Sequence, residues 1–302
     1  MRGNDRPLDG VHLKRPRYRL VDGFRLPRGF PARAFRSALH YAPMAGDVFV
    51  ATYPKCGTTW VQYIVYLLAN RGRALPSGAN LGQVFPHLEE VGAEAAEALS
   101  SPRLIKTHLP CSLMPFSAAA KYVYVARNPF DCAVSFYHHT RGFPQHYDFA
   151  TGAFDIFFEC FIAGEVDFGD YFDNLLPWHA LRDSSNVLFL TYEDLRRDPA
   201  GRIAGIGRFL GGPAAAAAAD ADCLAAVVEE SSFGRMHRDQ ARWSSQRPAG
   251  MPPFVRKGIV GDWRSTFSVE QARRLAAKFD ERTRGKDAAS LWPDILAGAR
   301  SG

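Results

Sequence analysis

Apolar positions along this chain alternate between short β-branched runs and longer stretches with helical spacing. Residues 47–53 form one such run, rich in valine and aromatic side chains, which stops at Pro54. A polar loop follows, and apolar residues with a helical period then occupy residues 61–68. This pattern predicts a strand, a tight loop and a helix.

The same alternation continues through the chain. Short apolar runs predict strands within residues 103–110, 121–126 and 186–192. Because strands that alternate with helices form mainly parallel sheets, we expect a single α/β domain over residues 1–302, with a central, mainly parallel sheet flanked by helices on both faces. The expected helices are residues 30–39, 88–99, one starting at Pro129, 154–164, 171–181 interrupted by Pro177, 220–230, and 268–280 capped by Ser268.

Three segments lack this periodicity. Residues 1–20 are rich in arginine, proline and glycine and are expected to form a loose arm. Six alanines at residues 214–219 follow a Gly-Gly-Pro sequence and suggest a surface insertion without chemistry. Residues 240–262 contain several prolines and glycines, and a loop of that length is typical of a mobile, functional segment.

Composition narrows the class of protein. The 302 residues carry a formal net charge of +6, which fits an anionic ligand, although no block of five or more basic residues points to nucleic acid. The five cysteines are odd in number and show no C-x-x-C spacing, so a reducing compartment is expected. Neither a signal peptide nor a long apolar span is evident, and we expect a cytoplasmic protein.

The loop after the first predicted strand suits an anion. Its backbone N–H groups and those of the following helix converge where the helix dipole also favours negative charge. Gly57 allows close approach, Thr58 and Thr59 add hydroxyl donors, and Lys55 adds a positive charge. The loop differs from the nucleotide triphosphate P-loop, in which lysine follows the glycine.

Further candidates for chemistry stand at predicted strand ends, where open parallel sheets bind ligands. Lys106 and His108 follow the second strand, and Arg127 follows the third, beside a predicted helix start. A further cationic feature is the adjacent pair Arg256 and Lys257, which precedes Gly258. Each residue taken alone is more often structural or merely solvated, so their joint occurrence is the signal.

Four motifs together resemble the cytosolic sulfotransferases, which transfer a sulfuryl group from 3′-phosphoadenosine 5′-phosphosulfate (PAPS). The resemblance spans about residues 47–270. The motifs are Tyr-Pro-Lys-Cys-Gly-Thr-Thr-Trp at 53–60, Lys-Thr-His-Leu-Pro at 106–110, Arg-Asn-Pro through serine at 127–135, and Arg-Lys-Gly with Gly-Asp-Trp at 256–263.

The resemblance implies a role for each matching residue. The 5′-phosphosulfate would lie on Lys55, Cys56, Gly57, Thr58, Thr59 and Trp60, and the 3′-phosphate on Arg127, Ser135, Arg256, Lys257 and Gly258. The adenine would lie against Trp60, Tyr192, Ser232 and Phe233. His108 would be the catalytic base, and its unperturbed pKa near 6.5 suits proton transfer near neutral pH. Lys55 and Lys106 would stabilise charge during transfer, and no metal is required. The product would be 3′-phosphoadenosine 5′-phosphate (PAP).

The sequence also departs from the family. Cys56 replaces a common serine, and because a thiol at a helix N-terminus can have a lowered pKa, we expect sensitivity to oxidation. The dimer segment of the family corresponds to Arg264, Ser268, Val269 and Arg273, and Arg273 replaces its acidic residue, which leaves a homodimer open.

The acceptor is less well defined. Matching segments include Phe85, His87 and Phe143, and aromatic residues nearby suggest an apolar pocket for a phenol, aromatic amine or hydrophobic alcohol. These aromatics are equally compatible with a core role. The main alternative is a noncatalytic nucleotide-binding protein of the same fold, which would not need His108. A P-loop kinase is disfavoured because the lysine precedes the glycine.

Overall fold

The computed structural model describes residues 14–243 and 250–301. Its centre is a four-stranded parallel sheet in the order β4-β3-β5-β6. The strands are β3 (Asp47–Thr52), β4 (Arg103–Thr107), β5 (Lys121–Ala126) and β6 (Val187–Thr191). The predicted parallel sheet is therefore confirmed, and the first strand in this sheet, β3, has neighbours on both sides.

Side chains on the central strands alternate between two separate cores. Val48 and Val50 of β3 pack with the helices on one face, whereas Phe49 and Ala51 pack with those on the other. Helices therefore cover both faces, as predicted. One face carries α2 (Thr58–Ala69), α11 (Pro199–Leu210), α12 (Gly212–Ala219) and α13 (Ala221–Glu230), and the other carries α1 (Ala32–Ala38), α6 (Pro129–Gly142), α8 (Phe154–Ile162), α9 (Tyr171–Ala180), α15 (Val269–Thr283) and α16 (Pro293–Ser301).

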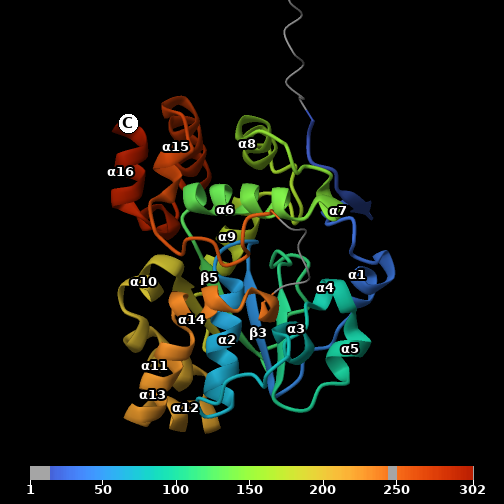
Figure 1. Ribbon diagram of the computed structural model, residues 1–302, viewed down its shortest axis with the longest axis vertical. Helices are drawn as coiled ribbons and strands as arrows, with labels where there is room; N and C mark the ends of the chain where they lie inside the picture. The colour runs from blue at the N-terminus through green and yellow to red at the C-terminus, as the bar shows by residue number, and fades with distance from the viewer. Residues whose placement is uncertain (1–13, 244–249, 302) are drawn as a thin grey trace, which may run out of the picture.

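Shorter elements surround this framework. In Figure 1, α2 lies in front of the sheet, and α15 and α16 lie beside α6 at the top. The remaining elements are the hairpin β1 (Arg19–Val21) and β2 (Phe24–Leu26), α3 (Leu81–Val84), α4 (Leu88–Val91), α5 (Ala93–Glu97), α7 (Pro144–Tyr147), α10 (Tyr192–Arg197) and α14 (Phe233–Arg238), with short 3-10 helices at Gln240–Arg242, Asp262–Ser265 and Asp287–Ser290.

Local sequence signals explain several element boundaries. The Asn128 side chain accepts a hydrogen bond from the Asp131 N–H at 2.9 Å, so α6 begins with an asparagine cap followed by proline. Ser268 and Gln271 form the capping box that begins α15. Both helix starts are where the sequence predicted them.

Four local predictions are wrong. Residues 14–20 are not a loose arm: the Arg17 N–H donates to the Tyr147 carbonyl at 2.8 Å, and the chain then enters β1. The expected helix at 88–99 is divided at Gly92 into α4 and α5. Helix α9 continues past Pro177 to Ala180, although a proline inside a helix removes one backbone hydrogen bond.

The alanine tract is the fourth correction. It forms most of α12, where Ala214, Ala217 and Ala218 are buried against α2 and α11. Alanine has a high helix propensity, and its small side chain allows the Gly207 backbone of α11 to approach closely. The tract is therefore a packing element rather than an insertion. Residues 1–13 of the expected arm and 244–249 of the expected loop lie outside the described residues.

Candidate active site

The site lies at the carboxyl ends of the central strands. From β3 the chain passes to β4 on one side and then crosses over to β5 on the other, so the strand order reverses between β3 and β5 while the strands stay parallel. Open parallel sheets bind ligands at such a point. A cavity of about 540 Å³ opens there, and both Lys55 after β3 and Arg127 after β5 line it.

The loop between β3 and α2 has an unusual backbone. Gly57 has φ of 97°, and a Cβ atom at this position would lie 2.8 Å from the Tyr192 ring. Glycine is therefore required both for the backbone angle and for the close approach of Tyr192. Thr58 is the first residue of α2, so the unpaired N–H groups of that helix start at the cavity.

Lys55 lies on this loop and points along the cavity. Its ammonium nitrogen is 4.2 Å from the centre of the Phe254 ring and 3.5 Å from Nδ1 of His139. Lys55 has a backbone φ of 70°, which is uncommon for a residue other than glycine. The loop thus holds a cation above an aromatic ring from the segment that precedes Arg256.

Cys56 is oriented differently from its neighbours. Its side chain is fully buried, and Sγ lies 3.7 Å from Sγ of Cys132 and 3.9 Å from the Pro54 carbonyl oxygen. The thiol faces α6, beneath the loop. Cys56 would therefore contact a bound anion through its backbone and not through its thiol.

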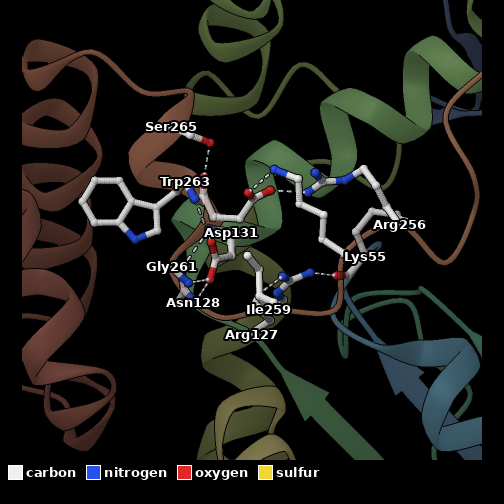
Figure 2. A network of polar contacts seen from close by, with 11 residues as sticks. Lys55, Arg127, Asn128, Asp131, Arg256, Ile259, Gly261, Trp263 and Ser265 are labelled. Atoms are coloured by element: carbon white, nitrogen blue, oxygen red, sulfur yellow. Dashed lines mark hydrogen bonds and ion pairs between the residues drawn. The ribbon is translucent and has the colours of Figure 1, made fainter. Parts of the chain in front are cut away.

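Arg127 joins the loop to the segment after Lys257 (Figure 2). Its guanidinium donates to the Lys55 carbonyl at 3.3 Å and to the Ile259 carbonyl at 3.2 Å, and it lies over the Tyr192 ring at 4.4 Å. Nε is buried and has no hydrogen-bond partner within residues 14–243 and 250–301. Burial opposes the charge, but the surrounding tyrosine and carboxylates raise the pKa of Arg127 above its usual value. A buried guanidinium with an unused donor is suited to an anion.

Asp131 fixes the segment that carries the last cationic pair. Its carboxylate accepts from the Gly261 N–H at 2.8 Å and from the Trp263 N–H at 3.0 Å, as Figure 2 shows. The Asn128 amide also donates to it at 2.9 Å. The start of α6 and residues 261–263 are therefore held together by one buried carboxylate.

Arg256 and Lys257 share a single partner. Asp262 contacts the Arg256 guanidinium at 2.5 Å and the Lys257 ammonium at 2.6 Å. Burial works to raise the pKa of Asp262, but the hydrogen bonds from Lys257 and Arg256 lower it overall. Gly258 has φ of 65° and packs against Phe233, where a Cβ atom would lie 2.4 Å from the ring. The sequence predicted the cations but not Asp262, although the aspartate lies in the same motif.

The remaining predicted donor-site residues divide into two groups. Trp60, Ser135, Tyr192 and Phe233 line the cavity, and the Trp60 and Tyr192 rings pack edge to face at 5.5 Å. The Ser232 hydroxyl instead accepts from the Arg235 N–H at the start of α14, while Ser231 lines the cavity. A direct role for Ser232 in adenine binding stays a prediction.

His108 is buried at the end of β4. Its Nδ1 lies 2.9 Å from the carbonyl oxygen and 3.1 Å from the hydroxyl of Thr52. Because a carbonyl oxygen only accepts, Nδ1 carries the proton, which leaves Nε2 as a proton acceptor. Burial, together with Lys106 and His87, holds the pKa of His108 well below its usual range, so the ring is neutral at pH 7.

A buried carboxylate orients this histidine. Oε1 of Glu89 accepts from the His108 backbone N–H at 2.6 Å and from the Thr107 hydroxyl at 2.9 Å. The Asn174 amide donates to the His108 carbonyl at 3.1 Å. Glu89 and Asn174 were not predicted, because neither belongs to a motif with recognisable spacing.

The region beyond His108 is more polar than the sequence suggested. Phe85, His87 and Phe143 line the cavity as expected, and Lys106 does too; burial lowers the pKa of Lys106. The cavity is also lined by the titratable side chains of Glu90, His139, His146 and Asp167. Aromatic residues and these carboxylate and imidazole side chains line the cavity together, and the expectation of an apolar, aromatic pocket stays a prediction.

Two limits apply to the described part of the chain. It contains no group of three or more histidine, cysteine, aspartate or glutamate side chains arranged to hold a metal ion. It also contains no helix long and apolar enough to cross a membrane. The fold and the site together define an α/β protein whose cations, helix N–H groups and neutral histidine line one cavity, an arrangement suited to an anionic ligand.

Comparisons with known proteins identify the family. A family model described as the sulfotransferase domain matches residues 45–287. The chain is 35% identical to sulfotransferase 1C2 of Rattus norvegicus over 254 residues, covering 79% of this chain and 83% of that protein. It is 35% identical to sulfotransferase 1A1 of Canis lupus familiaris over 288 residues, covering 90% and 94%. The chain belongs to the sulfotransferase family.

Solved structures agree on the fold. Mouse sulfotransferase SULT7A1 complexed with PAP matches with a TM-score of 0.75 and 24% identity, covering 94% of this chain and 99% of that one. Retinol dehydratase in a complex with retinol and PAP matches with a TM-score of 0.73 and 25% identity, covering 84% and 87%. The chain is accordingly an enzyme of the PAPS-dependent sulfotransferase class.

Proposed function

We propose that this enzyme transfers a sulfuryl group from PAPS to a hydroxyl or amine of a small aromatic or hydrophobic acceptor, with His108 as the general base. The observation that carries the proposal is the tautomer of His108. Its Nδ1–H is committed to Thr52, so Nε2 is the nitrogen that can take a proton inside the cavity. The loop between β3 and α2, which carries Lys55, lies at the same end of the sheet.

The residues present fit the donor. The helix start at Thr58 and the unpartnered Nε of Arg127 supply donors for two separate anionic groups, and the close approach of Tyr192 to Gly57 supplies an aromatic surface between them. In this proposal the 5′-phosphosulfate is held by Lys55 and residues 56–60. The 3′-phosphate is held by Arg127, Ser135, Arg256, Lys257 and Gly258, and the adenine by Trp60, Tyr192 and Phe233.

Each side chain near the reacting group has one task. His108 removes the acceptor proton at Nε2 as the acceptor oxygen or nitrogen bonds to sulfur. Lys55 stabilises the phosphate oxygen that leaves, and Lys106 stabilises the peripheral oxygens of the transferring group. His108 is buried and Lys106 is partly buried, which limits the access of water to this step. Binding of the nucleotide competes with Asp262 for Arg256 and Lys257.

The test is transfer of label from radiolabelled PAPS to a panel of phenols, catecholamines, sterols and aliphatic alcohols. We expect wild-type protein to label at least one acceptor class and His108→Ala to lose that transfer while it still binds PAP. A noncatalytic nucleotide-binding protein would instead bind PAP without labelling any acceptor. Equal transfer by wild type and His108→Ala would contradict the role of His108.

Further expectations accompany this proposal. The sulfuryl group carries one charge fewer than a phosphoryl group, so activity should survive treatment with EDTA. We expect a cytoplasmic location and no nucleic-acid partner. A homodimer stays open, since Val269 and Arg273 lie exposed at the start of α15; sedimentation analysis of wild type and Arg273→Glu would resolve whether this segment associates.

A further inference from the structure

Asp167 is a buried carboxylate of the acceptor region with half of its hydrogen-bonding capacity unused. It is 2% exposed, and Oδ2 accepts from the Tyr147 hydroxyl at 2.7 Å. Oδ1 is buried and has no hydrogen-bond partner among the residues that the structure describes. The residue lines the cavity. A buried acceptor oxygen without a partner is costly, so a residue of the cavity lining that carries one favours a ligand with a donor group.

The turn that carries Asp167 is fixed by its neighbours. Phe168 has φ of 64°, an uncommon value for an aromatic residue. Its N–H donates to the Arg25 carbonyl at 2.9 Å, and the next carbonyl, of Gly169, accepts from the Tyr53 hydroxyl at 2.9 Å. Strain of this kind persists only where the surroundings enforce it, and here they hold the carboxylate in place.

The charges around Asp167 leave it without a cation of its own. Within residues 14–243 and 250–301, no lysine or arginine forms an ion pair with it. Its direct partner is the Tyr147 hydroxyl of α7, and the His87, Tyr18 and Tyr53 side chains lie close enough to interact with its charge. Burial raises the pKa of Asp167 to about 7, so its ionised form needs a positive partner.

A second carboxylate lies at the rim of the same cavity. The Glu90 side chain is 53% exposed, and Oε2 is 3.7 Å from Nδ1 of His87. The neighbouring His87 lowers the pKa of Glu90, so this group is charged at neutral pH. Negative charge at the mouth favours entry of a cation.

Aromatic side chains connect the carboxylates to the catalytic end. The Phe168 ring packs edge to face on His108 at 5.1 Å and on Phe30 at 6.2 Å. The residue directly before Phe168 is Asp167, so one side chain in this turn contacts His108 and the adjacent one carries the unpartnered oxygen. The turn at Asp167 and Phe168 therefore contributes both to the packing of His108 and to the cavity wall.

We propose that the acceptor region selects a small hydroxylated aromatic molecule that carries a protonated amine, with Asp167 as the ammonium partner and Glu90 as an attractive charge at the rim. The proposal rests on the proposed function for the reacting hydroxyl, but the recognition of the cation is a binding property that is measured separately. Asp167 and Glu90 determine specificity here and take no part in proton transfer.

The test uses two acceptors of similar shape and different charge. Tyramine carries a protonated amine, whereas 4-propylphenol has a methyl group in its place. Calorimetric binding to the PAP-loaded protein gives a Kd for each, and we expect wild type to bind tyramine at least about tenfold more tightly, as one charge-assisted hydrogen bond to a buried carboxylate implies.

Three variants locate the source of that preference. Asp167→Asn should reduce it to about threefold or less, and Glu90→Gln should reduce it by a smaller factor because its side chain is half exposed. The matched control is Asp183→Asn, an exposed aspartate that contacts Arg182 and does not line the cavity, and it should keep the wild-type preference. Circular dichroism verifies that each variant is folded, and Glu90→Gln carries the test should Asp167→Asn not fold.

The outcomes separate this inference from the reaction. Equal binding of the two acceptors by wild type overturns it, as does a preference that is unchanged in Asp167→Asn or that falls equally in Asp183→Asn. A preference that depends on Asp167 supports it even where no label is transferred, and in that case only the proposed reaction fails. Binding of neither acceptor to the PAP-loaded protein contradicts the inference.

Discussion

The two ends of the cavity are built in different ways. The donor end combines Lys55 and Arg127, which follow strands of one sheet, with the pair Arg256 and Lys257, and Arg127 joins these segments by donating to the carbonyls of Lys55 and Ile259. The acceptor end consists of side chains from separate turns, among them His87, Glu90 and Asp167. A fixed anion site follows from strand and helix geometry, whereas acceptor recognition depends on loops that the sheet only positions.

Arg127 offers the largest expected effect at the donor end. Arg127→Gln removes a buried charge whose Nε is unpartnered, and we expect PAP affinity to fall by about a thousandfold, the loss that several charge-assisted hydrogen bonds imply. Calorimetry with PAP measures it. Arg197→Gln, a variant of an exposed arginine paired with Asp194, is the control and should bind PAP as wild type does. A loss of less than about threefold in Arg127→Gln would remove Arg127 from the donor site.

Asp167 should make the free energy of unfolding depend on pH. Its pKa in the folded chain is about 7, against 3.8 as its ordinary value. Between these values the unfolded chain releases the proton while the folded chain retains it, so the free energy of unfolding falls as pH rises from about 4 to 7. Asp167→Asn should remove a few kcal/mol of this fall, at about 1.4 kcal/mol per pH unit.

Urea denaturation at pH 5 and pH 8 measures this difference. The stability of Asp167→Asn relative to wild type should increase between the two pH values, and that of Asp183→Asn should not. A relative stability of Asp167→Asn that is the same at both pH values would show that the carboxyl ionises normally in the folded protein.

Gly57 tests the donor end through its backbone. Gly57→Ala places a side chain at φ of 97° and within 2.8 Å of the Tyr192 ring. We expect a loss of about 1–3 kcal/mol in the free energy of unfolding and weaker PAP binding, because both the backbone angle and the tyrosine must change. Thermal unfolding with and without PAP measures both effects. Gly234→Ala has open space at its Cβ position and serves as the control.

Cys56 gives the smallest expected effect. Peroxide would oxidise its thiol to a sulfenic acid and release water, and the Cys132 thiol at 3.7 Å would then displace a second water to form a disulfide. Because both thiols are buried, and burial raises the pKa of Cys132, we expect slow inactivation that Cys56→Ser suppresses. Inactivation at the wild-type rate in Cys56→Ser would refute this prediction.

The sequence predicts the donor end well because its signals are local. The strand, loop and helix around Lys55, the cap at Asn128 and the turn at Gly258 each arise from a few consecutive residues. The acceptor end depends on contacts between distant residues. The burial of Asp167 results from Tyr147 and from a turn fixed by Arg25 and Tyr53, which no short pattern indicates.

The same distinction explains the errors in the fold. The composition of the alanine tract predicts an insertion, whereas the burial of this tract against α2 and α11 makes it the helix α12. Residues 14–20 were expected to be loose because of their charge and prolines. In the structure, Lys14 contacts Asp148 at 2.7 Å and Arg15 contacts Glu165, so charge fixes this segment to the domain.

The most direct test of the account measures PAP affinity and sulfuryl transfer in the same preparations of wild type, His108→Ala and Arg127→Gln. The account predicts that His108→Ala loses transfer by at least about a hundredfold, the usual contribution of a general base, and binds PAP normally. Arg127→Gln should lose PAP affinity. Two results would contradict the division of the cavity into a donor end and an acceptor end. One is sulfuryl transfer that is retained in His108→Ala, and the other is a loss of PAP affinity in that variant as large as in Arg127→Gln.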